Sequence, residues 1–83
     1  ALEAFERAAV IAHDSRTVQY NVALMMLRIG EVARSIKFAK TAIEIDPFQA
    51  YPYHLLARVY QRQGRQREMG KLLKRVGELG LKP

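Results

Sequence analysis

Few residues of this chain have the type and spacing that catalysis or metal binding requires. The sequence contains no cysteine and two histidines, so disulfides and thiolate metal sites are excluded. His13 and His54 lie far apart, and neither belongs to a metal-binding pair such as HExxH. The GxxxxGKS or GxxxxGKT phosphate loop and the GxSxG nucleophile motif are also absent. We therefore predict a protein that is not an enzyme and that holds no metal or cofactor.

Positive charge is the second chemical feature of the sequence, and it is unevenly placed. The net charge is +6. Residues 1–57 contain six basic and six acidic residues, whereas residues 58–83 contain eight basic and two acidic residues. The whole excess lies in the last third, so an anionic partner should be sought there.

Length and composition limit the class of protein. A chain of 83 residues forms one domain at most. With 49% hydrophobic and 27% charged residues, it is too apolar for a disordered chain and too charged for a membrane protein. The longest apolar run, residues 22–27, is far shorter than the ~20 residues that cross a bilayer. We expect no insertion into a membrane.

The spacing of apolar residues predicts five helices. We expect them over residues 1–12, 16–29, 31–45, from 49 or 52 to 63, and 66–79. Asp14 or Ser15 should cap the second helix, and Gly30 and Gly64 should form left-handed turns. Asp46 and Pro47 should stop the third helix.

The second and fifth of these helices are unusual. Residues 16–29 leave almost no polar face, which predicts a helix with neighbours on both sides. In the fifth helix, Gly70 and Gly77 each cost roughly 1 kcal/mol relative to alanine. We expect Gly70 to allow close approach of a neighbouring helix, and Gly77 to lie where the helix frays before Gly80.

The chain also repeats itself with a period of 34 residues. A step of this length carries apolar, small and turn positions onto positions of the same kind: Val22, Ala23, Met26 and Gly30 onto Leu56, Ala57, Tyr60 and Gly64. A fixed period of this size predicts stacked helical hairpins rather than a free-standing globular fold.

The repeating unit resembles the tetratricopeptide repeat, whose pattern is W-x2-L-G-x2-Y, then A-x3-F, then P. The residues that carry the resemblance are Tyr53, Leu56, Ala57 and Tyr60 in the first block, Ala1 and Phe5 in the second, and Pro47. In the middle repeat, Gln19 replaces the aromatic residue of the first block. The resemblance covers the whole chain.

This resemblance implies an all-α fold, a right-handed α-solenoid of antiparallel helix hairpins with five helices. Residues 1–15 would be the second helix of a truncated repeat, and residues 16–49 a complete repeat. Residues 50–83 would be another complete repeat with a basic C-terminal helix. The phase of the repeats predicts a segment of a longer array.

The resemblance also implies a function. Such repeats usually hold a peptide or another protein in a concave groove lined by the first helix of each hairpin. We therefore predict a protein-protein interaction scaffold. The groove residues that follow are Tyr20, Asn21, Leu24, Leu27, Arg28, Tyr51, His54, Arg58 and Arg62, together with Thr17, Leu55 and Gln61.

The predicted groove has apolar and aromatic residues at its base and arginines beside them. Such a groove suits a partner that has an apolar anchor and negative charge. The competing interpretation is that Leu24 and Leu27 belong to the core and that Arg58 and Arg62 form a solvated face. Both interpretations are open at the level of sequence.

Two alternative functions remain. The basic last third could bind nucleic acid or another polyanion. Nucleic acid is disfavoured, because Tyr60 is the only aromatic residue there and the basic residues are spread around the fifth helix. Weak self-association through uncapped repeat ends is the other alternative, since such ends leave apolar surface uncovered.

Overall fold

The computed structural model describes residues 2–81, and within that range it contains five helices and no strand. They are α1 (Leu2–Ile11), α2 (Arg16–Arg28), α3 (Val32–Ile45), α4 (Tyr51–Gln63) and α5 (Gln66–Glu78). The predicted all-α fold is confirmed. The expected roles of Ala1 in the first helix and of Lys82 in the basic segment lie outside the described residues.

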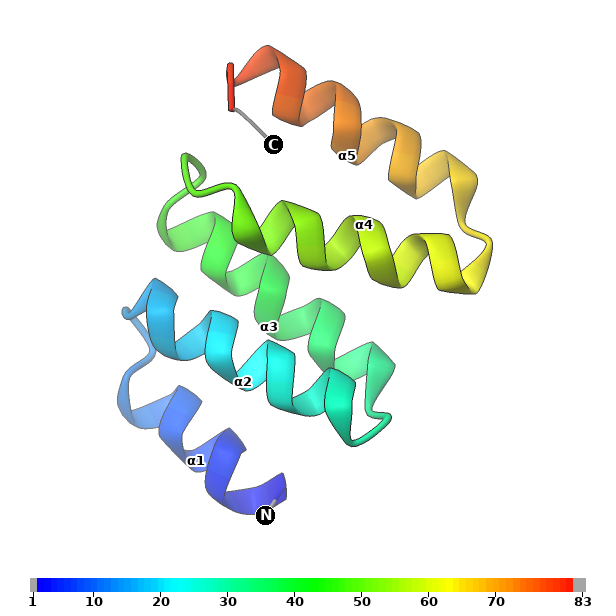
Figure 1. The fold of residues 1–83 in the computed structure, drawn as a ribbon. Helices are drawn as coiled ribbons and strands as arrows, with labels where there is room; N and C mark the ends of the chain where they lie inside the picture. Colours follow the sequence, from blue (N-terminus) through cyan, green and yellow to red (C-terminus); the bar gives the residue numbers. More distant parts are fainter. Residues whose placement is uncertain (1, 82–83) are drawn as a thin grey trace.

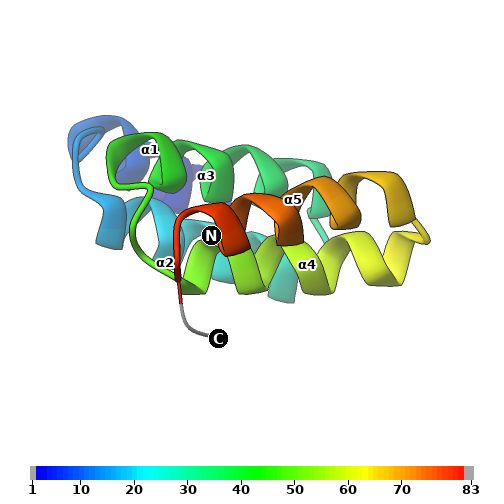
Figure 2. The same cartoon turned by 90° about the horizontal axis from the view of Figure 1, so that it is seen from above.

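The five helices form two layers, as Figures 1 and 2 show. One layer contains α2 and α4, and we call it the first-helix layer. The other contains α1, α3 and α5, and we call it the second-helix layer. Packing follows the order of the chain, because α1 contacts α2, α2 contacts α3, α3 contacts α4 and α4 contacts α5. No helix of the described chain is both long enough and apolar enough to cross a membrane.

Local signals set the helix ends. Ser15 has an extended backbone, and its side-chain oxygen accepts a hydrogen bond from the N–H of Val18 at 3.3 Å, which caps α2. Gly30 and Gly64 have φ values of 85° and 70°. Only glycine adopts this left-handed conformation at little cost, so both residues end a first helix and reverse the chain.

The α2–α3 hairpin packs most extensively of all the helix pairs. Ala23 on α2 and Ser35, Ala39 and Ala42 on α3 have no exposed surface. The hydroxyl of Ser35 donates to the backbone carbonyl of Ala23 at 2.8 Å. Because these side chains are small, the two helices approach closely and exclude water from the contact.

Gln19 connects α2 to α1 by hydrogen bonds, although it stands where the repeat pattern has an aromatic residue. It is 2% exposed, and its Nε2 donates to the carbonyls of Ala9 at 2.8 Å and Ala12 at 3.2 Å. Tyr53, which stands 34 residues later, is also 2% exposed and donates its hydroxyl to the carbonyl of Pro47 at 2.8 Å. Gln19 and Tyr53 therefore have the same structural role, although one is an amide and the other a phenol. Each side chain donates to a backbone carbonyl of the preceding segment and holds that segment against a first helix.

The expected close approach at Gly70 is wrong. A Cβ atom built at Gly70 meets no atom within 4 Å. α5 has no buried residue, and it continues through Gly77 to Glu78. The neighbouring helix does not pack against this position, because α5 rests on α4 through partly buried residues such as Met69 and Leu72.

We predict that Gln19→Ala lowers the free energy of unfolding by about 1–3 kcal/mol, because the Ala9 and Ala12 carbonyls lose the Gln19 hydrogen bonds and a cavity forms, although Ala12 still accepts from the N–H of Ser15. Urea unfolding followed by circular dichroism measures the loss. Hydrogen exchange should show faster opening in α1 with little change in α4. The control is Asn21→Ala, which removes an exposed amide from the same helix. Equal losses in the two variants would contradict the assignment.

The two glycines Gly64 and Gly70 should respond oppositely to alanine. Gly64→Ala places a side chain at φ 70° and should cost about 1–2 kcal/mol. Gly70→Ala lies inside α5 in open space and should add up to about 1 kcal/mol. Thermal unfolding of both variants tests this pair. A destabilised Gly70→Ala would mean that another helix does approach closely there.

Candidate functional site

All nine predicted partner-binding residues lie on α2 or α4, in the first-helix layer. The exposed ones are Asn21, Arg28, Tyr51, His54, Arg58 and Arg62, and the partly buried ones are Tyr20, Leu24 and Leu27. Thr17 and Gln61 are exposed as well. The predicted set therefore occupies one layer of the fold.

Two tyrosines of this set meet across the boundary between the hairpins. The ring centroids of Tyr20 on α2 and Tyr51 on α4 are 5.3 Å apart, and the planes are inclined at 50°. A tilted arrangement of this kind is favourable for aromatic rings. Tyr20 also packs against the core, and Tyr51 donates its hydroxyl to Oε1 of Gln49 at 2.9 Å. The pair is therefore an ordered aromatic surface.

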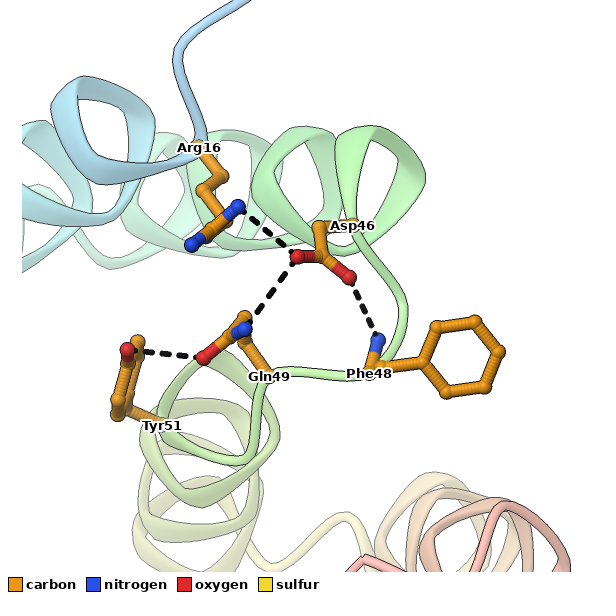
Figure 3. A network of polar contacts seen from close by, with 5 residues as sticks. All are labelled: Arg16, Asp46, Phe48, Gln49 and Tyr51. Carbon is orange, nitrogen blue, oxygen red and sulfur yellow. Dashed lines mark hydrogen bonds and ion pairs between the residues drawn. The ribbon is translucent and has the colours of Figure 1, made fainter.

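The carboxylate of Asp46 holds the segments around this pair, as Figure 3 shows. It forms an ion pair with Arg16 at 2.9 Å and accepts from Nε2 of Gln49 at 3.3 Å. It also accepts from the backbone N–H of Phe48 at 3.1 Å. The network joins the start of α2, the end of α3 and the start of α4, and the Phe48 ring points away from it.

Sequence reasoning missed this network. It identified Asp46 only as part of the stop signal that ends α3. An aspartate that accepts from the N–H two residues later forms a recognisable turn, so the link to Phe48 could have been found. The link to Arg16 could not, because the two residues lie 30 positions apart and only the packing of α2 on α3 brings them together.

Three of the four arginines of the first-helix layer are available to a partner. α2 and α4 contain no aspartate or glutamate. Arg28, Arg58 and Arg62 form no ion pair with any residue between 2 and 81. α2 and α4 run in the same direction (Figure 1), so the tyrosines lie near the start of this layer and Arg28 and Arg62 near its other end. A guanidinium can grip a carboxylate with two parallel hydrogen bonds.

The leucines of the predicted set serve partly as core. Leu24 and Leu27 are partly buried and pack against the main core cluster. Leu55 is buried within that cluster, so its side chain supports α4. The apolar part of the surface therefore rests mainly on Tyr20 and Tyr51. Among residues 2–81, no group of three or more histidine, aspartate or glutamate side chains could hold a metal ion.

Comparison with known proteins bears on the family. Residues 38–71 match a family model described as tetratricopeptide repeat. This segment runs from within α3 through α4 into α5 and includes the Asp46 turn. Searches of curated proteins and of solved structures found no match. The predicted resemblance is confirmed over this segment: the chain carries a tetratricopeptide repeat, which supports its place in the tetratricopeptide repeat family.

Proposed function

We propose that this chain is a non-catalytic scaffold that binds a segment of a partner protein across the first-helix layer. A tetratricopeptide repeat suggests a protein-protein interaction module. The observation that supports the choice of this surface is its charge. Its two helices carry four arginines and no carboxylate, and Arg16 alone of the four is neutralised by an ion pair within residues 2–81.

The tyrosine pair supplies the apolar anchor of the proposed site. Tyr51 is already held through its hydroxyl and Tyr20 through the core. A partner that covers the two rings therefore loses little binding free energy in ordering them, because both side chains are already held in place. Rigid aromatic side chains of this kind often carry a large share of binding energy.

Helix geometry sets the spacing of the partner's charges. Arg58 and Arg62 stand seven and eleven residues after Tyr51. At about 1.5 Å per residue, these positions lie roughly 10 Å and 16 Å along α4. An extended peptide advances about 3.3 Å per residue. Carboxylates about three and five residues from the apolar anchor would therefore reach the two arginines.

The charge part of this proposal is tested with a capped peptide that has one tyrosine and glutamates three and five residues from it. Isothermal titration calorimetry measures the affinity. The double variant Arg58→Glu, Arg62→Glu should weaken binding by more than about tenfold, because repulsion replaces two charge-assisted contacts. The control is Arg67→Glu, Lys74→Glu, which makes the same charge change on exposed positions of α5. Equal weakening by both would show that only net charge matters and would reject the site.

The aromatic part is tested separately. Tyr51→Ala should weaken binding of the same peptide by about tenfold, which corresponds to about 1.4 kcal/mol. Phe48→Ala is the matched control, because Phe48 is 64% exposed and points away from the Asp46 network. Unchanged affinity in Tyr51→Ala would remove the apolar half of the proposal.

A further inference from the structure

A cleft of about 330 Å³ lies between α3 and α5, outside the proposed binding surface. Its apolar lining consists of Ile43 from α3, Tyr53, Leu56 and Tyr60 from α4, and Leu72 from α5. Tyr53 and Tyr60 stand two positions after Tyr51 and Arg58, so they point to roughly opposite sides of α4. The cleft therefore opens on the second-helix layer.

α5 packs less extensively on α4 than α3 packs on α2. The contact of α3 with α2 uses three residues without exposed surface, Ser35, Ala39 and Ala42. A step of 34 residues carries them onto the larger Met69, Leu73 and Val76. α3 packs against both α2 and α4, whereas α5 packs mainly on α4. α5 therefore has no buried residue, and Leu73 is 52% exposed.

The rim of the cleft is cationic. Lys40, Lys71 and Arg75 line it together with one acid, Glu68. None of the three basic residues forms an ion pair within the described part of the chain. Burial raises the pKa of the Tyr53 hydroxyl on the floor of the cleft, and the positive charge of Arg75 opposes that rise. An anionic group at the rim would meet uncompensated positive charge.

A second cleft on the same layer provides an internal comparison. It has about 490 Å³ and lies between α1 and α3. Most residues that line the second cleft lie 34 positions before a residue that lines the first cleft. The two linings differ in charge. Glu6 replaces Lys40, and Thr41 replaces Arg75. Glu6 also forms an ion pair with Arg34 at 3.2 Å. The repeat thus forms the same kind of cleft twice, and only the α3–α5 cleft is strongly basic.

We propose that the α3–α5 cleft is a second binding site, which holds an acidic peptide segment of another protein by one apolar side chain. The apolar side chain lies on the floor, and flanking carboxylates contact Lys40, Lys71 and Arg75. A volume at the low end of the roughly 300–1,000 Å³ of ligand pockets suits a short segment. The floor does not suit bases, because Tyr53 and Tyr60 are 2% and 5% exposed and offer no ring face for stacking.

The test uses a capped peptide with one leucine between two glutamates on each side, titrated into the ¹⁵N-labelled chain. We expect amide shifts at Ile43, Leu72 and Arg75. The double variant Lys40→Glu, Lys71→Glu should weaken binding by more than about tenfold. The control, Lys37→Glu, Lys74→Glu, makes the same charge change at the repeat-equivalent lysines outside this cleft and should weaken it less than about threefold.

Several outcomes would overturn the proposal. One is equal weakening in the two double variants, and another is equal affinity for a peptide with alanine in place of leucine. The same shifts on adding a short oligonucleotide would indicate a phosphate site instead. Shifts confined to Tyr20, Tyr51 and Arg58 would assign the peptide to the first-helix layer. Absence of shifts at millimolar peptide would also reject the cleft.

Discussion

The close contact of α2 with α3 is the constraint on which the rest of the structure depends. Ala23, Ser35, Ala39 and Ala42 are fully buried there, and the Ser35 hydroxyl bonds to the carbonyl of Ala23. This contact fixes the end of α3 next to the start of α2, where Asp46 meets Arg16. The Asp46 turn then directs α4 so that Tyr51 reaches Tyr20. A substitution that separated α2 from α3 would therefore disturb the first-helix layer as well.

α4 belongs to both candidate binding surfaces. One side of this helix contributes Tyr51, Arg58 and Arg62 to the first-helix layer, and the other contributes Tyr53, Leu56 and Tyr60 to the cleft. The Tyr53 hydroxyl and the Gln49–Tyr51 contact hold its N-terminal end. A single well-held helix can thus present two surfaces, because a helix shows different residues on opposite sides. Both surfaces combine basic and aromatic residues.

The helix α5 has no buried residue and also has more basic residues than any other helix. Arg67, Lys71, Lys74 and Arg75 all lie on it. Burying a charged group without a partner is costly, so a helix with this composition keeps most of its surface in water. Opening of α5 is therefore expected to cost less than opening of α2 or α3.

The helices, their ends and the resemblance to the tetratricopeptide repeat could be predicted from the sequence alone. Apolar spacing, Ser15, Gly30, Gly64 and Pro47 act over a few residues, so they can be read without the fold. Which groups meet depends on the packing of the helices: Gln19 meets Ala9, Arg16 meets Asp46, and Tyr20 meets Tyr51. The space beside Gly70 and the cleft under α5 also belong to the tertiary structure. The reason is physical, because these features depend on how side-chain volumes of separate helices fit together, and no pattern within one helix specifies that fit.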